Sequence, residues 1–469
     1  MVRSMMAKQG VPGIALAVVQ GQRVLHLQGY GVRVAGLPQE VDADTVFQLA
    51  SVSKALASTV LAASLNDPAA WDLRIATLDS GFTLASPSVT QSLTLRDLMS
   101  HRSGLPTGGG DELEGLGYRR EEILRRMRYL QLAPFRQQYN YSNFGLSEAA
   151  YAMAGSLGLE WETMSEQLLY QPLGMHSTSS RHADFLAALN RASGHVLVNG
   201  AFQPLYQRNA DAQTPAGGVS SSVRDLSSWL RLQLGHGQFE GRQLIDADVL
   251  AATWQPVIRT GAPSAAGTED FYGIGWHTTQ DSQGNRLLSH YGAFTSGAST
   301  AVIMAPERQL ALVVLTNTAP IGVAEALSSS FMELALTGQV SRDWLAFHQK
   351  LFQDYIAAHT SSERDYSIKP QPGAPALPLA SYAGVYHNDF YGPVRIAIGQ
   401  GALQLTIGPR NIVMQMTHWD GDTFIATTPD PDINDGGAAV FSIGPQQRAV
   451  RLRLENYDLK GEGDFVRVD

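Results

Sequence analysis

Two residues near the amino terminus have the types and the spacing that nucleophilic catalysis requires. Ser51 and Lys54 are three positions apart in a stretch with helical spacing of small and apolar residues, so their side chains share one helix face. A serine hydroxyl is a weak nucleophile, and an adjacent, partly neutral amine could accept its proton. The chain has five lysines, and Ser51 is the only serine three residues before one of them. Alone, this spacing also fits a capped helix with a surface lysine.

Two later segments carry further groups suited to the same chemistry. Tyr141–Asn143 opens a predicted helix and offers a phenol that relays protons and an amide that binds a carbonyl. His290–Ala293 precedes a predicted strand, and Gly292 has no side chain, so a substrate can lie against the backbone there. The backbone N–H of Ala293 could pair with that of Ser51 to form an oxyanion hole.

These motifs, in this order, resemble the serine β-lactamase and penicillin-binding-protein superfamily. The resemblance is to its class C-like branch, which also contains carboxylesterases, D-aminopeptidases and acyltransferases. Further segments typical of that branch are Leu98–Pro106, Pro172–Met175 and Pro215–Gly218. The resemblance covers roughly residues 10 to 340. It implies that Ser51 is the acylated nucleophile.

The resemblance also implies roles for the other motif residues. Lys54 is expected to be the proton acceptor of Ser51, and Tyr141 the partner base. Asn143 is expected to contact the substrate. His101 is expected to hydrogen-bond to loop backbone behind the site.

The third motif departs from that of most β-lactamases. Those enzymes usually carry Lys-Thr-Gly, whose lysine helps to hold the substrate carboxylate, whereas this position is His290 here. A neutral imidazole is a poor anchor for an anion. Esterases and D-aminopeptidases of the branch commonly have His-x-Gly, so His290 and Gly292 are expected to bind and position such a substrate.

We therefore expect a serine hydrolase of the carboxylesterase or D-amino-acid peptidase type, working through a Ser51 acyl-enzyme on ester or amide bonds. Two alternatives stay open. One is a β-lactamase that hydrolyses antibiotics. The other is a non-catalytic, penicillin-binding sensor of peptidoglycan-like ligands.

The motifs must be positioned by a sheet built from both ends of one large domain. Ile14–Val19 and Val24–Tyr30 form one predicted hairpin, and Ser299–Met304 and Gln309–Leu315 form a second. The region between the hairpins is mostly helical. The helices expected there are Ser51–Leu65, Thr94–Ser100, Arg119–Leu130, Asn143–Leu157, Glu160–Tyr170 and Val223–Leu234. Ala324–Leu336 is expected to pack on the sheet as a further helix.

The predicted fold class is α/β (α+β) of the β-lactamase/transpeptidase-like type over residues 1–340, an antiparallel sheet flanked by helices with a large helical insertion. Residues 341–378 are expected to be a helix and a stiff linker, since Lys369–Pro378 contains four prolines. Residues 379–469 alternate between apolar and polar side chains, which predicts a small all-β barrel. This tail resembles the lipocalin-like barrels often appended to such hydrolases.

Composition narrows the possible partners. The 469 residues carry a formal net charge of -9 with few lysines, which argues against nucleic acid. The absence of cysteine excludes thiol nucleophiles, disulfides and thiolate metal sites. The chain has no His-x-His or His-Glu-x-x-His spacing, so we expect no metal and no cofactor.

The expected partner is a small ester, amide or short peptide substrate. No membrane span is expected, because the longest apolar runs fall far short of the ~20 residues that cross a bilayer. A homo-oligomer stays open. So does the location, which would be periplasmic or secreted with a leader and cytoplasmic otherwise.

Two other patterns favour plain structural interpretations. Residues Arg119–Arg136 include six arginines, and their spacing against Glu121 and Glu122 favours a solvated helix. The Gly-x-Ser-x-Gly pattern is absent, so an α/β-hydrolase is disfavoured.

Overall fold

The computed structural model describes residues 1–263, 269–360, 365–428, 433, 437–458 and 461–469. Residues 361–364 of the predicted linker region lie outside this description. Packing divides the chain into two units. The first consists of Met1–Ser80, Gln91–Gly104 and Pro134–Tyr355. The second consists of Gly81–Thr90, Leu105–Ala133 and Ile356–Asp469.

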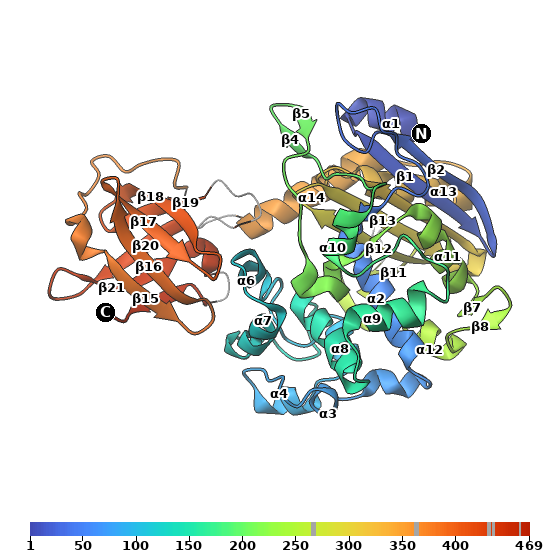
Figure 1. The fold of residues 1–469 in the computed structure, drawn as a ribbon, viewed down its shortest axis with the longest axis horizontal. Coiled ribbons are helices and arrows are strands. Elements are labelled where there is room, and N and C mark those ends of the chain that lie inside the picture. The colour runs from blue at the N-terminus through green and yellow to red at the C-terminus, as the bar shows by residue number, and fades with distance from the viewer. Residues whose placement is uncertain (264–268, 361–364, 429–432, 434–436, 459–460) are drawn as a thin grey trace. The chain divides into compact units, whose positions relative to one another are not determined.

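The first unit is built on an eight-stranded antiparallel sheet with the strand order β2-β1-β14-β13-β12-β11-β10-β9 (Figure 1). Both predicted hairpins are present, and the pairing of β1 with β14 joins the two ends of the domain as expected. The strands are β1 (Gly13–Gln20), β2 (Arg23–Gly31), β9 (Ile258–Pro263), β10 (Glu269–Tyr272), β11 (His277–Gln280), β12 (Arg286–Phe294), β13 (Ala298–Ala305) and β14 (Leu310–Thr316).

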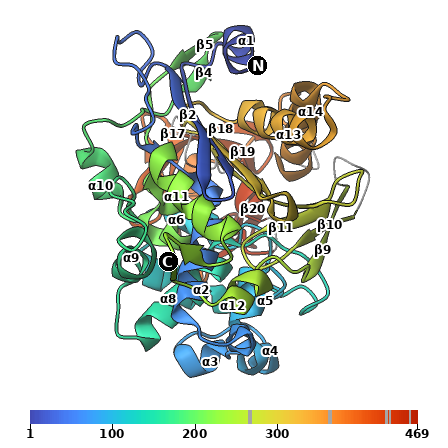
Figure 2. The same ribbon diagram turned by 90° about the vertical axis from the view of Figure 1, so that its right-hand side faces the viewer.

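The central strands β1, β13 and β14 are buried on both faces, apart from Gln20 at the end of β1. Residues such as Ile14 and Leu312 pack against helices α13 (Val323–Thr337) and α14 (Trp344–Thr360). Helix α11 (Val223–Leu234) packs on β1 and β14 from the opposite side, as Figure 2 shows. A strand covered on both faces needs apolar residues at every position, which explains the continuous apolar runs.

Further helices and short strands belong to the two units. The remaining helices are α1 (Val2–Gln9), α2 (Ser53–Ser64), α3 (Ile75–Leu78), α4 (Pro87–Ser92), α5 (Leu95–Met99), α6 (Asp111–Gly115), α7 (Arg120–Arg126), α8 (Asn143–Ser156), α9 (Trp161–Ser165), α10 (His182–Ala187) and α12 (Ala247–Ala252). The short paired strands are β3 (Phe47–Gln48) with β6 (Ser220–Ser221), β4 (Val196–Val198) with β5 (Ala201–Gln203), and β7 (Gln238–Phe239) with β8 (Arg242–Gln243). Among the described residues, no helix combines the length and apolar character needed to cross a membrane.

The second unit contains a closed barrel of eight antiparallel strands in chain order, which confirms the predicted all-β tail. Alternate residues point inward, and the burial pattern of β16 alternates accordingly. The strands are β15 (Gly384–Asn388), β16 (Gly392–Gly399), β17 (Ala402–Ile407), β18 (Ile412–Asp420), β19 (Thr423–Thr427), β20 (Gly437–Ile443), β21 (Ala449–Leu454) and β22 (Asp464–Arg467).

The segment Leu105–Ala133 belongs to the same unit as the barrel and is hydrogen-bonded to it. The Tyr118 hydroxyl donates to the carbonyl of Tyr391 at 2.5 Å. Nη1 of Arg126 donates to the carbonyls of Asp389 at 2.7 Å and Phe390 at 2.6 Å. The interpretation of this arginine-rich stretch as a solvated helix is therefore wrong for Arg126.

Replacing Arg126 by alanine tests how firmly this segment is held. The change removes two hydrogen bonds from a charged donor, so we expect the free energy of local unfolding to fall by about 1.5–3 kcal/mol. Hydrogen–deuterium exchange of residues 105–133 measures it. Arg125→Ala is the matched control, because Arg125 is exposed, and we expect a change within about 0.5 kcal/mol. Equal exchange in both variants contradicts a stabilising role for Arg126.

Candidate active site

Ser51 lies in a 3₁₀ turn, Ala50–Val52, immediately before α2. Ala50 is buried and has a φ of 46°, in the left-handed region that alanine rarely adopts. Two contacts hold the turn: Leu49 donates its N–H to the Val219 carbonyl at 2.9 Å, and the Thr300 hydroxyl donates to the Leu49 carbonyl at 2.6 Å. Strain of this kind is typical of active sites, where surrounding structure enforces it.

Strand β12 approaches this turn so closely that only glycine fits at position 292. A Cβ on Gly292 would lie 2.3 Å from the Leu49 carbonyl oxygen and 2.9 Å from the Ser51 backbone nitrogen. The pairing of β11 with β12 covers residues 286–289, so Gly292 and the exposed Ala293 lie beyond it. The amide of Ser51 and the strand edge at Ala293 are therefore brought together.

Lys54 is fully buried at the start of α2 and has an acceptor for each of its three N–H donors. Its Nζ lies 2.9 Å from Ser51 Oγ, 2.6 Å from Asn143 Oδ1 and 2.8 Å from the Ala216 carbonyl oxygen. Nζ also lies 4.5 Å from the ring centroid of Tyr141. Because a hydroxyl both donates and accepts, the Lys54–Ser51 contact can carry a proton in either direction.

The Ala216 carbonyl reaches Lys54 from an uncommon backbone turn. Residues Thr214–Gly218 form a single π-helical turn with Pro215 at its start. Such turns are rare and occur often at functional sites. The segment Pro215–Gly218, noted in the sequence as typical of the family branch, thus supplies a ligand to the lysine.

His101 holds the backbone on both sides of Tyr141, at Asn140 and at Ser142. The Asn140 N–H donates to the His101 carbonyl at 2.8 Å, and the Ser142 N–H donates to His101 Nδ1 at 3.2 Å. The ring centroids of His101 and Tyr141 lie 4.5 Å apart. The Ser142 side chain caps α8 by accepting the Gly145 N–H at 3.0 Å. This cap fixes the backbone between Tyr141 and Asn143.

His101 contributes as a neutral group. Burial, together with the charge of Lys54, holds the pKa of His101 well below its usual range. Its Nδ1 accepts a backbone N–H, so the ring proton is on Nε2. The backbone bonding predicted for His101 is present in the structure.

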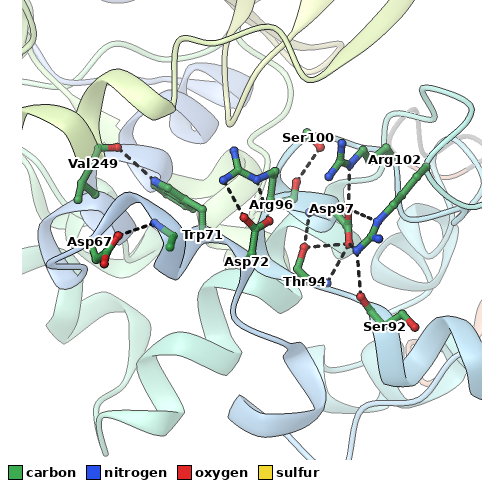
Figure 3. Close-up of polar contacts among 12 residues, drawn as sticks. Asp67, Trp71, Asp72, Ser92, Thr94, Arg96, Asp97, Ser100, Arg102 and Val249 are labelled. Carbon is green, nitrogen blue, oxygen red and sulfur yellow. Dashed lines mark hydrogen bonds and ion pairs between the residues drawn. The ribbon is translucent and has the colours of Figure 1, made fainter.

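The loop that leads to Tyr141 is held by a buried carboxylate, Asp97, shown in Figure 3. Arg102 donates to it at 2.7 Å, and Arg136 donates at 3.0 and 2.8 Å. Thr94 adds a hydroxyl donor at 2.8 Å and caps α5. The solvated-helix interpretation is therefore wrong for Arg136 as well.

Asp97 is ionised in this setting. Burial opposes its charge, but the hydrogen bonds from Arg136 and Thr94 and the charge of Arg102 outweigh burial, so the pKa of Asp97 is lowered. The carboxylate thereby ties Arg102, next to His101, to Arg136, five residues before Tyr141.

His290 has partners for both ring nitrogens inside the protein. Burial, with His277 and Lys54 nearby, holds the pKa of His290 well below its usual range, so the ring is neutral. Nδ1 lies 2.9 Å from the Tyr291 carbonyl, which only accepts, so Nδ1 carries the proton. Nε2 therefore accepts from the Tyr272 hydroxyl at 2.9 Å. This bonding favours a positioning role for His290.

The structure brings all the predicted motif residues to one end of β12 and the start of α2. The side chain of Tyr291, between His290 and Gly292, points to the opposite face of the sheet and lies near His348 of α14. Sequence reasoning missed Asp97, Arg136 and Tyr272. Arg136 and Tyr272 act through contacts distant in sequence, whereas the capping-box spacing of Thr94 and Asp97 is a local signal for Asp97.

No group of three or more His, Asp or Glu residues within the described ranges is arranged to hold a metal ion. The site's own groups include a hydroxyl, an amine, a phenol and backbone amides. These groups suit nucleophilic attack on a carbonyl followed by proton transfer.

Comparison with known proteins agrees with this geometry. The family model described as Beta-lactamase matches residues 1–335, and the chain belongs to that family. A second model, described as Domain of unknown function (DUF3471), matches residues 369–465, over the barrel.

Curated relatives share about a quarter of their residues with this chain. "Unguisins hydrolase ungD'" of Aspergillus campestris is 26% identical over 411 residues, covering 82% of this chain and 74% of the relative. "D-alanyl-D-alanine-carboxypeptidase/endopeptidase AmpH" of Escherichia coli is 24% identical over 348 residues, covering 69% of this chain and 84% of the relative. "Penicillin-binding protein 4" of Amycolatopsis lactamdurans is 26% identical over 321 residues, covering 66% of this chain and 81% of the relative. The family and these names support a hydrolase.

A solved structure shares the whole fold. The octameric penicillin-binding protein homologue from Pyrococcus abyssi aligns with a TM-score of 0.63 at 17% identity, covering 99% of this chain and 98% of that one. The likeness extends over both the β-lactamase-like part and the barrel.

Replacing Asp97 by asparagine tests the network behind Tyr141. Removing the charge weakens the hydrogen bonds to Arg102 and Arg136, whose side chains are 19% and 43% exposed, so we expect a loss of about 1.5–3 kcal/mol in unfolding free energy at neutral pH. Asp72→Asn is the control, because Asp72 is 55% exposed in its pair with Arg96 and its loss should cost less than about 1 kcal/mol. Denaturant unfolding measures both.

The same pair of variants gives a pH signature. A carboxylate with a lowered pKa in the folded state stabilises above its unfolded pKa, and this stability is lost as the pH falls through the folded pKa. The deficit of Asp97→Asn should therefore shrink in acid. A deficit no larger than that of Asp72→Asn at neutral pH contradicts the network.

Proposed function

We propose that this protein is a serine hydrolase that cleaves ester or amide bonds through an acyl-enzyme on Ser51. The observation that carries the proposal is the buried Lys54 ammonium, whose Nζ lies 2.9 Å from Ser51 Oγ. Asn143 and the Ala216 carbonyl hold that amine in place. A serine beside a fixed lysine, whose charge stabilises a neighbouring phenolate, is suited to lose its proton to that pair.

The proposed acylation step uses groups that lie within the site. The Lys54/Tyr141 pair starts as an ammonium and a phenolate, so it can accept one proton. The Ser51 Oγ–H bond breaks, its proton passes to the pair, which becomes an ammonium and a neutral phenol, and Oγ forms a bond to the substrate carbonyl carbon. The oxyanion that results is bound by the backbone N–H groups of Ser51 and Ala293. The bond to the leaving group then breaks, and the leaving group takes the proton from the pair.

Deacylation follows the reverse proton path. Water gives a proton to the Lys54/Tyr141 pair and attacks the acyl carbon, and Ser51 leaves with that proton restored. Tyr141 suits this part because a cation beside a phenol stabilises the phenolate form. No cofactor is needed for either step.

Within this class, an esterase or D-amino-acid peptidase is favoured over a β-lactamase. The neutral His290, with both nitrogens engaged, offers no charge to a substrate carboxylate. The names of two relatives, an unguisins hydrolase and a D-alanyl-D-alanine carboxypeptidase/endopeptidase, support peptide-like amides. A β-lactamase is the second candidate, favoured by the family model alone.

Two further parts of the proposal concern the rest of the chain. The catalytic part extends to about residue 340, and the barrel, which is of lipocalin-like type, contributes no catalytic group. Assembly into a homo-oligomer is also proposed, and the octameric structural relative supports it. Light scattering of the purified protein tests this assembly.

Replacing Ser51 by alanine tests the proposed mechanism. We expect a loss of at least ~10³ in rate with the fold retained, as for other nucleophile deletions. The rates are measured with nitrophenyl esters, D-amino-acid anilides and a chromogenic cephalosporin, which also ranks the substrate classes. Ser64→Ala, in the same helix α2, is the control. Full activity of Ser51→Ala on the preferred substrate contradicts the mechanism.

Replacing Lys54 by arginine separates proton transfer from charge. Arginine keeps the cation but does not give up its proton, so we expect a rate nearly as low as that of Lys54→Ala. If Lys54→Arg keeps most of the rate, the lysine acts as a charge alone. No turnover by the unmodified protein on any of the three substrate classes supports the sensor alternative.

A further inference from the structure

His290 connects strand β10 to the backbone of its own strand, β12, through its two ring nitrogens. Its Nδ1 donates to the Tyr291 carbonyl at 2.9 Å. Its Nε2 accepts from the hydroxyl of Tyr272, on β10, at 2.9 Å. A neutral imidazole has one donor and one acceptor nitrogen, so both bonds belong to the same tautomer. The Tyr272 hydroxyl therefore supplies the donor that Nε2 needs while Nδ1 holds the Tyr291 carbonyl.

The Tyr272 hydroxyl is a rigid donor. The side chain of Tyr272 is fully buried. Its ring centroid lies 4.8 Å from that of His101 and 5.5 Å from that of Tyr139. His101 also holds the backbone on both sides of Tyr141. The ring that supports His290 is thus packed against the residue that supports the Tyr141 loop.

The bond from His290 acts on the strand edge that carries the proposed oxyanion donor. In an antiparallel ladder, the N–H and C=O groups of alternate residues point to the same edge of a strand. The Tyr291 carbonyl and the Ala293 N–H therefore share one edge of β12, about 7 Å apart along the strand. The described pairing of β11 with β12 ends at Ser289. Beyond that pair, the His290 side chain bonds to the backbone of this edge.

The link between the Tyr291 carbonyl and the Ala293 N–H is a glycine. Gly292 has no side chain to restrict its backbone, so a displaced Tyr291 carbonyl can turn the next peptide with it. The space for such a movement is small, because a Cβ on Gly292 would lie 2.9 Å from the Ser51 backbone nitrogen. An oxyanion donor acts only while it points at the position where the charge develops. The direction of the Ala293 N–H therefore depends on how firmly the Tyr291 carbonyl is held.

We propose that Tyr272 is a positioning residue for the oxyanion-binding N–H of Ala293, and that it acts through His290. The hydroxyl holds the imidazole, the imidazole holds the Tyr291 carbonyl, and the carbonyl sets the direction of the N–H two residues later. This inference rests on the proposed hydrolase function. It gives His290 the task of orienting backbone in place of binding an anion.

Replacing Tyr272 by phenylalanine removes the hydroxyl and keeps the ring. The oxyanion exists only in the transition state and the tetrahedral intermediate, so a misdirected N–H lowers kcat and leaves substrate binding unchanged. We expect kcat to fall at least about ten-fold, less than the ~10²–10³ that loss of a whole oxyanion donor costs, with KM within about three-fold. A kcat within two-fold of the unmodified value overturns the proposal.

Tyr170→Phe is the matched control. The Tyr170 hydroxyl is also buried and has a hydrogen bond with the Ser180 hydroxyl at 2.8 Å, outside the groups assigned to the site. Each variant loses one buried hydroxyl bond, and denaturant unfolding compares their stabilities. We expect Tyr170→Phe to keep kcat within two-fold. An equal fall of kcat in both variants overturns the proposal, because it shows a general effect of stability.

A double-mutant cycle with His290→Ala tests the route of the effect. If Tyr272 acts through His290, adding Tyr272→Phe to His290→Ala changes kcat by less than two-fold. The same fall of kcat in the presence and absence of His290 overturns this route.

Nitrogen NMR of the unmodified protein, with ring-labelled histidine, tests the tautomer without any change at Tyr272. The His290 signals are those that disappear in His290→Ala. We expect a protonated Nδ1 and an unprotonated Nε2, and the opposite tautomer overturns the proposal even if Tyr272→Phe does not fold.

The two proposals fail in different ways. If the unmodified protein has Ser51-dependent turnover and Tyr272→Phe keeps its kcat, the positioning role alone is wrong. If the unmodified protein has no Ser51-dependent turnover on any of the three substrate classes, the hydrolase function itself is wrong.

Discussion

A buried ammonium is the constraint on which the rest of this site depends. Lys54 is fully buried, and a cation removed from water is stable only where the protein supplies acceptors. Three chain segments do so: the Ser51 turn, the start of α8 at Asn143, and the π-helical turn at Ala216. The lysine of the pair that is proposed to take the proton thereby also fixes the relative positions of the groups around it.

The surrounding fold can be understood as the means of holding those segments. The all-apolar centre of the sheet fixes β12 and β13, and Thr300 of β13 holds the Leu49 carbonyl. The missing side chain at Gly292 lets the Ser51 turn reach the strand edge, and the left-handed Ala50 completes that turn. Asp97 and its two arginines hold the Tyr141 loop.

The sequence predicted the parts of this arrangement that are local. The Ser51–Lys54 spacing, the hairpins at both ends of the sheet and the alternating strands of the barrel each reflect a period visible within a few residues. The Asp97–Arg136 ion pair, the Tyr272–His290 bond and the bonds from Arg126 to the barrel were not predicted, because the partners in each are far apart in the chain. An arginine-rich stretch looks solvated in sequence, and only the tertiary fold shows which carbonyls and carboxylates it meets.

The central claim is that Ser51 is the nucleophile, and it is tested most directly by locating a covalent adduct. The protein is treated with a fluorophosphonate, digested, and mapped by mass spectrometry, with Ser51→Ala treated in parallel. Because Lys54 lies 2.9 Å from the Ser51 hydroxyl, we predict one adduct per chain, on Ser51, and none in the variant. An adduct on another residue, or equal labelling of the variant, would contradict the account.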